Sequence, residues 1–385
     1  MCMSFQPDYV NRPTESLICY FGSLAKKYGG INLAQGIPGF QPPKELLDIL
    51  SSLVYEDYHQ YAPGHGNQKL LTLLAKHYQQ YLPVSEENIL IVQGATEAGS
   101  LLFTYLRSII DGKFSALALD PVYETFSHLP AIYNANFVPF YTNNNTIDFS
   151  LLEETIIENR VKVIFLNSPG NPLGSLLSKE DYLQFIALSK KHEFYIILDA
   201  VYKELYFESE PYLPLDSIGE RMFYVNSFSK MLSVTGWRVG YFITSTSHMQ
   251  KINQIHDYTG LCAPALFQEA IAQYLINYDF GKDYLNSIRH KLHANYTLLS
   301  QYLISKGFKI SDIKGGYFIW AELPKRYIDG YDFSLKLYEY QQVAIVPGEH
   351  FSDRGNRYVR FNIARKEHEI KEAIDRLEIF LNQNI

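Results

Sequence analysis

One lysine of this chain stands where its amine could act as a nucleophile. Lys230 comes shortly after a short apolar run, Met222–Asn226, and lies between small hydroxyl residues instead of on a charged helix face. Such a position can keep an amine partly out of water, which lowers its pKa and makes it reactive toward carbonyl groups. The sequence therefore indicates a reactive lysine beyond the end of a buried strand.

Residues near this lysine are suited to holding a phosphate group. Ser227 and Ser229 supply hydroxyl groups, and Arg238 supplies a planar cation that can donate two hydrogen bonds to one anion. A lysine beside a phosphate site suggests pyridoxal phosphate, held by the lysine as a Schiff base. A surface lysine after a strand is the alternative. The Gly-x-Arg-x-Gly-Tyr continuation of the segment favours the cofactor.

The composition describes a globular protein large enough for two domains. The chain has 385 residues, of which 47% are hydrophobic and 19% charged. The net charge of −7, without a basic block, argues against nucleic-acid binding. No apolar run reaches the roughly 20 residues of a membrane helix, and no signal peptide is indicated. The cysteines, Cys2, Cys19 and Cys262, fit neither a disulfide framework nor a metal site, so we expect a cytoplasmic protein without a metal.

Strand-like and helical patterns alternate along most of the chain. Apolar strands separated by helices predict an α/β fold with a mostly parallel central sheet flanked by helices. After Cys262 the pattern changes to long helices followed by further strands, which predicts a smaller α+β domain. We expect an N-terminal arm over residues 1–35 that joins the small domain, a large domain over 36–280 and the small domain over 281–385. Among the predicted small-domain strands is one run over Val343–Pro347.

Candidate ligand-binding residues follow five of the predicted strands. Because ligands of parallel sheets bind beyond the carboxyl ends of the strands, these residues are expected to meet at one site. In chain order they are Gly94, Asp120–Tyr123, Asn167–Asn171, Asp199 and Ser227–Lys230.

With these motifs in this order, the sequence resembles the class I/II aminotransferases, the fold-type I pyridoxal-phosphate enzymes. It is most similar to their kynurenine, methionine and glutamine aminotransferase-like branch. The resemblance runs from Ile31 to the C-terminal helix and rests on the segments 167–174, 199–202 and 227–241. It implies a homodimeric enzyme that moves an amino group from an L-amino acid to a 2-oxo acid by a ping-pong mechanism.

The resemblance assigns roles around the cofactor ring. Lys230, Asp199 and Tyr202 are the expected catalytic residues. A carboxylate such as Asp199 keeps the pyridine nitrogen protonated, so that the ring can accept electrons. Tyr202 and Asn171 would hydrogen-bond the phenolic oxygen, and Tyr123 would stack on the ring. A strand-ending turn for Asp199 and a core position for Tyr123 are the alternatives.

Further residues are assigned to the phosphate. Gly94, Ala95 and Thr96 lie between a strand and a helix, where backbone N–H groups and the helix dipole favour an anion. Tyr61 matches a segment that reaches across a dimer interface to the phosphate of the neighbouring subunit, although a plain loop needs no such role. The resemblance also implies cis peptide bonds before the prolines of the segment 167–174.

The substrate is expected to bind through its α-carboxylate. The resemblance places Arg360 opposite this group, because a guanidinium can pair with a carboxylate through two hydrogen bonds. Arg357 and Arg365 are competing candidates. Gly36 and Ile37 match the segment that closes over the substrate, and Asn171 also faces the carboxylate. No second arginine for a side-chain carboxylate is evident, so neutral, sulfur-containing or aromatic amino acids are favoured.

Two other functions use the same residues. A cysteine-S-conjugate β-lyase would need the same lysine, acid and arginine, because only the fate of the carbanion differs. A non-catalytic regulatory protein that binds pyridoxal phosphate is the other alternative. It is less favoured, because every residue expected for catalysis is present.

Overall fold

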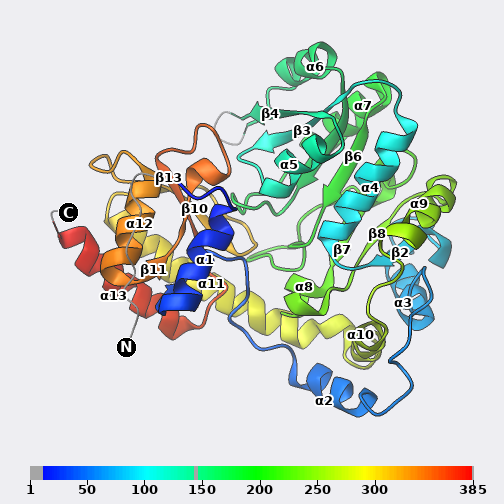
Figure 1. Ribbon diagram of the computed structural model, residues 1–385, viewed down its shortest axis with the longest axis horizontal. Coiled ribbons are helices and arrows are strands. Elements are labelled where there is room, and N and C mark those ends of the chain that lie inside the picture. Colours follow the sequence, from blue (N-terminus) through cyan, green and yellow to red (C-terminus); the bar gives the residue numbers. More distant parts are fainter. Residues whose placement is uncertain (1–11, 143–145, 384–385) are drawn as a thin grey trace.

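A seven-stranded sheet forms the centre of the larger half of the protein (Figure 1). The computed structural model describes residues 12–142 and 146–383. All neighbouring strands of this sheet are parallel except around β8, which runs antiparallel to both β2 and β7. In spatial order the strands are β2 (Ile89–Val92), β8 (Gly240–Ile243), β7 (Met222–Ser227), β6 (Tyr195–Asp199), β5 (Val161–Asn167), β3 (Ser115–Asp120) and β4 (Asn136–Tyr141).

Helices cover both faces of this sheet, because its strands are apolar on both sides. Alternate residues of a strand point to opposite faces. In β5, Val163 and Phe165 belong to one core and Ile164 and Leu166 to the other. The first core contains residues of α4 (Ala95–Ile109), α5 (Glu124–Ile132) and α9 (Thr246–Thr259). The second contains residues of α3 (Gln68–Tyr78), α6 (Phe149–Glu158), α7 (Lys179–His192) and α10 (Ala265–Asn277). This confirms the predicted α/β fold with a mostly parallel, covered sheet.

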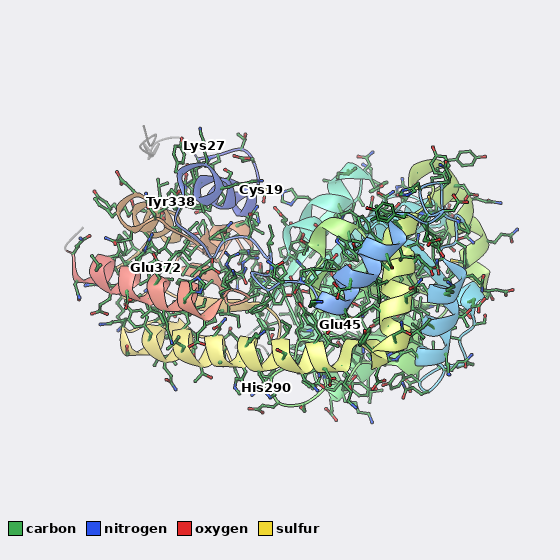
Figure 2. The ribbon with its side chains drawn as sticks, turned by 90° about the horizontal axis from the view of Figure 1, so that it is seen from below. Cys19, Lys27, Glu45, His290, Tyr338 and Glu372 are labelled. Atoms are coloured by element: carbon green, nitrogen blue, oxygen red, sulfur yellow. The ribbon has the colours of Figure 1, made fainter. Side chains whose placement is uncertain are left out.

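The smaller half contains an antiparallel sheet of four strands. Their spatial order is β12 (Val346–Pro347), β13 (Tyr358–Asn362), β10 (Phe318–Glu322) and β9 (Lys309–Ile310). A separate pair joins the N-terminal segment to this half, since β1 (Ile31–Asn32) runs parallel to β11 (Val343–Ala344). The long helix α11 (Lys282–Ser305) passes along both halves (Figures 1 and 2).

The prediction of one strand over Val343–Pro347 is wrong. The run forms two strands of two residues each, and they belong to different sheets. Val343 pairs with Ile31, whereas Val346 pairs with Arg360. The apolar pattern is continuous because both strands are buried, so it gave no sign of the change of partner between them.

The remaining helices complete the chain. They are α1 (Leu17–Tyr28), α2 (Lys44–Leu53), α8 (Phe228–Met231), α12 (Gly330–Gln341) and α13 (Glu367–Asn382). Within the described ranges, no helix combines the length and the apolar character that crossing a membrane requires. Cys19 and Cys262 are free thiols, and Cys2 lies outside the described residues.

Candidate active site

The strand ends bring most of the predicted site residues to one cavity of about 320 Å³. Asn167 at the end of β5 lies opposite Asp199 at the end of β6, and Asp199 lies opposite Val225 near the end of β7. This position, beyond the carboxyl ends of parallel strands, is where such sheets bind ligands. The predicted residues that line the cavity are Gly36, Ile37, Ala95, Thr96, Tyr123, Asn171, Asp199, Tyr202, Ser227, Ser229, Lys230, Arg238 and Arg360.

Lys230 is held at the cavity by the short helix that follows β7. Ser227 caps this helix by accepting a hydrogen bond from the backbone N–H of Ser229 at 3.1 Å. The Nζ atom of Lys230 donates to the carbonyl oxygen of Gly36 at 2.6 Å. Burial, together with the nearby Arg360 and Arg238, lowers the pKa of Lys230 to about 8 against the opposing effect of Asp199. The amine is therefore available in its neutral, nucleophilic form near physiological pH.

An acid and a phenol accompany this amine. Asp199 is buried, and desolvation raises its pKa to about 6, although the backbone N–H of Val201 donates to its Oδ1 at 3.1 Å. Its carboxyl group is still ionised at neutral pH and can hold a proton on a nitrogen base. Tyr202 is also buried, and burial raises the pKa of its hydroxyl, which stays protonated as a hydrogen-bond donor. Its ring packs edge-on against Tyr317 and Phe318.

The start of α4 forms a seat for an anion. Gly94 precedes this helix with a φ of 86°, and no side chain caps the helix N-terminus. The Nη2 atom of Arg238 donates to the carbonyl oxygen of Gln93 at 2.8 Å, which places the guanidinium beside Gly94. A Cβ atom at Gly94 would lie 2.7 Å from this nitrogen. Gly240 allows the same close approach, since a Cβ there would lie 2.8 Å from the Cα of Gly94.

Arg360 lies fully buried on β13, on the side of the cavity that the small sheet provides. Its Nη1 donates to the Oδ1 of Asn171 at 2.8 Å, and its Nη2 donates to the carbonyl oxygen of Ala34. Its Nε has no partner in the described part of the chain. Burial lowers the pKa of Arg360 to about 10, so the group remains a cation at neutral pH. A buried cation with an unused donor fits a carboxylate ligand.

These residues fit pyridoxal phosphate. An amine with a lowered pKa lies near a buried acid, and the start of α4, Arg238 and two serine hydroxyls line the same cavity and can bind the phosphate. The segment that contains Asn171 adopts the shape expected of it, with cis peptide bonds before Pro169 and Pro172. Among the described residues no cluster of His, Cys, Asp or Glu is suited to a metal ion.

Tyr61 stands apart from this cavity within one chain. Its side chain is 83% exposed, and it lines a separate surface hollow together with Gln93 and Cys262. Gln93 directly precedes Gly94, so this hollow adjoins the anion seat from outside. Gly94 itself lies behind Arg238 and does not line the cavity.

The sequence did not predict some of the residues that line the cavity. Ile18 and Cys19 reach the cavity from α1, and Figure 2 shows Cys19 on the side of α1 that faces the larger half. Glu124 and Phe318 line it as well. Glu124 directly follows Tyr123 and could have been found from that adjacency. No sequence signal placed α1 at the cavity, because its position depends on packing against the small sheet.

The sequence matches the family of class I and II aminotransferases over residues 28–377. The chain therefore belongs to this family. It is 27% identical to the probable N-succinyldiaminopimelate aminotransferase DapC of Mycobacterium tuberculosis, over 93% of this chain and 94% of that protein. It is 30% identical to the aspartate aminotransferase of Thermotoga maritima, over 91% of each chain.

Solved structures agree with this assignment. The N-succinyldiaminopimelate aminotransferase of M. tuberculosis superposes with a TM-score of 0.87 at 26% identity, covering 95% of this chain and 97% of that one. A Methanococcus jannaschii protein, described as similar in its active site to kynurenine aminotransferases, has a TM-score of 0.83 at 26% identity, with 95% and 96% covered. The protein is thus an aminotransferase, an enzyme that uses pyridoxal phosphate and acts on amino acids and 2-oxo acids. The branch within the family stays a prediction.

The anion seat can be tested at Gly94. Alanine at this position would have to keep a φ of 86° with its Cβ 2.7 Å from the Nη2 of Arg238. We expect Gly94→Ala to raise the dissociation constant of pyridoxal phosphate roughly tenfold, measured by titrating the cofactor-free protein. Gly236→Ala is the control, because a Cβ there meets open space. Equal affinities in both variants would mean that Gly94 lies outside the phosphate site.

The lowered pKa of Lys230 predicts how its reactivity depends on pH. Its neutral fraction should level off above pH 8 and fall about tenfold for each pH unit below it. An ordinary lysine would keep gaining reactivity up to its usual pKa of 10.5. The measurement is the rate of acetylation of Lys230 in the cofactor-free protein, followed by mass spectrometry, with N-acetyl-lysine amide as reference. If the acetylation rate of Lys230 depended on pH in the same way as that of the reference compound, the lowered pKa of Lys230 would be refuted.

Proposed function

We propose that this aminotransferase binds the α-carboxylate of its substrate at Arg360 and moves the Cα proton with Lys230. One observation carries the proposal: an amine with a pKa of about 8 and a buried arginine line the same cavity. When bound, pyridoxal phosphate supplies the aldehyde and the electron-accepting ring. The protein supplies the binding, the orientation and the proton transfers.

Each remaining residue has a proposed task. Arg360 fixes the carboxylate, and the Asn171 amide, whose Oδ1 is already engaged by Arg360, offers its NH₂ group toward the cavity. The pKa of Lys230 near 8 would allow its amine to take the proton from Cα and deliver it to the carbon contributed by the cofactor's aldehyde. Asp199 holds a proton at the ring nitrogen, and Tyr202 donates to the phenolic oxygen. Tyr123 stacks against the ring.

The phosphate would be held at the larger half of the cavity. Gly94, Ala95 and Thr96 provide the helix start, while Arg238 faces the same point. The hydroxyl groups of Ser227 and Ser229, 2.9 Å apart, complete this group of donors. The proposal is supported by the start of α4, where within the described residues the N-cap Gly94 provides no side-chain cap.

We further propose a division of labour between the domains. Residues 36–280 would hold the cofactor, and residues 1–35 would join residues 281–385 in a small domain that covers the substrate. Pairing of β1 with β11 supports this division. Gly36 and Ile37, at the boundary, line the cavity and are placed to close over the substrate.

The substrates we favour are neutral, sulfur-containing or aromatic amino acids. Among the described residues that line the cavity, the only cations are Lys230, Arg238 and Arg360. All three are assigned to the cofactor or to the α-carboxylate. A side-chain carboxylate would therefore find no cation of its own, whereas Ile18 and Ile37 offer apolar contacts.

The enzyme is proposed to act as a homodimer in the cytoplasm. The exposed Tyr61, which lines the hollow beside the anion seat, supports a subunit contact. There Tyr61 would reach the phosphate of the partner subunit. The unpaired thiols of Cys19 and Cys262 fit a reducing compartment.

Replacing Lys230 tests the central assignment. We expect Lys230→Ala to lower turnover by roughly 10²–10⁴-fold or more, since both proton transfers depend on this amine. The visible absorbance that bound pyridoxal phosphate gives in the unaltered enzyme should be lost as well. Lys76→Ala, on an exposed position of α3, should leave both unchanged. A Lys230→Ala enzyme with ordinary turnover would rule out the mechanism.

The role of Tyr61 across the interface can be tested by mixing subunits. Neither Tyr61→Ala nor Lys230→Ala alone should have full activity. In a mixed dimer, one site combines Lys230 from the first chain with Tyr61 from the second, so random reassortment should restore about a quarter of normal activity. The measurement is turnover after unfolding and refolding the two variants together. If activity stays at the sum of the separately refolded variants, Tyr61 does not act on the neighbouring subunit.

A further inference from the structure

One acidic side chain in the cavity has no task in the proposed function. Five charged residues line the cavity in the described chain, and four of them are assigned to the cofactor or the substrate carboxylate. The fifth is Glu124, which begins α5 directly after Tyr123. It lies close enough to Arg360 for its charge to raise the pKa of that guanidinium, against the stronger effect of burial. A carboxylate therefore lies in the wall of the substrate space.

Glu124 is held in place by the smaller half of the protein. Its Oε2 lies 3.1 Å from the Nε2 of His350, and the side chains of Glu124 and His350 are 24% and 7% exposed. Burial would raise the pKa of Glu124, but the His350 ring and the Ser16 hydroxyl outweigh it and leave the pKa lowered. The carboxylate is thus ionised at neutral pH. His128, one turn along α5, also lies near it, and the charge of Glu124 acts in turn on Tyr123 and Arg360.

We infer that Glu124 is a specificity-determining residue that rejects amino acids whose side chain ends in a carboxylate and admits neutral side chains. The inference rests on the proposed function, since it takes Arg360 as the partner of the α-carboxylate. A second carboxylate would then extend into a partly desolvated space beside a like charge. Such a juxtaposition is costly and is a common way to exclude a wrong ligand. A side-chain amide of the same shape carries no charge and can donate a hydrogen bond to Glu124.

The test compares isosteric substrates in the enzyme loaded with pyridoxal phosphate. L-Glutamine and L-glutamate differ only in an amide and a carboxylate, and L-methionine serves as the neutral reference. We expect Glu124→Gln to raise kcat/KM for glutamate relative to methionine by roughly tenfold or more. Glu124→Asp, which keeps the charge, should retain the discrimination.

A binding measurement gives a second readout that needs no turnover. Glutarate and pentanoate have the same chain length, but glutarate carries a second carboxylate. By calorimetry the unaltered enzyme should bind pentanoate about tenfold more tightly than glutarate, and Glu124→Gln should remove most of this difference. Glu180→Gln, on the exposed start of α7 and outside the cavity, removes the same charge and should change neither ratio.

The possible outcomes separate the two proposals. Equal affinity of the unaltered enzyme for glutarate and pentanoate would overturn the role of Glu124, even if the Gln variant did not fold. The role of Glu124 would also be overturned if the ratio of kcat/KM for glutamate to kcat/KM for methionine were unchanged in an active Glu124→Gln enzyme. If the unaltered enzyme transaminated none of the three amino acids but still preferred pentanoate, the favoured substrate class would fail while the inference about Glu124 stood.

Discussion

Burial of the Lys230 amine is the constraint on which the rest of the site depends. Removal from water lowers its pKa to about 8, and the same burial raises the pKa of Asp199 to about 6. The ordinary pKa values of a lysine and an aspartate differ by more than six units. Desolvation brings the pKa values of these two side chains to either side of neutral pH. Groups with such values exchange protons at low cost, which is the property that a proton-transfer enzyme needs. The covered parallel sheet provides this burial, because its strand ends lie beneath helices on both faces.

A second constraint is that the carboxylate site is assembled from three distant segments. Arg360 comes from β13, Asn171 from the loop after β5, and Ala34 from the segment after β1. The backbone also connects them, since the N–H of Asn362 donates to the carbonyl oxygen of Leu33 at 2.8 Å. A buried guanidinium is costly to leave without hydrogen-bond partners. Correct docking of the N-terminal segment and the small sheet is thus a condition for forming the proposed carboxylate site.

The sequence predicted most of the large half and the cofactor side of the cavity, because these features depend on local patterns. Apolar strands and the residues that follow them can be read from neighbouring positions, as Asp199 and Lys230 illustrate. What it missed depends on contacts between distant segments. The split of Val343–Pro347 reflects two different partner strands. The position of Cys19 in the cavity wall reflects how α1 packs on the small half.

The balance of fixed charges in the cavity explains why one carboxylate can decide substrate choice. The cations are Arg238, Arg360 and the amine of Lys230, which the cofactor would engage, and the carboxylates are Asp199 and Glu124. A bound phosphate and a substrate carboxylate add negative charge that these arginines must meet. None of the described cavity residues offers a further cation that could pair with another anion. Glu124 is already ionised there. In a partly desolvated cavity such an excess is poorly screened. The proposed exclusion of acidic side chains thus rests on the charge balance of the whole cavity, to which Glu124 contributes the carboxylate without another task.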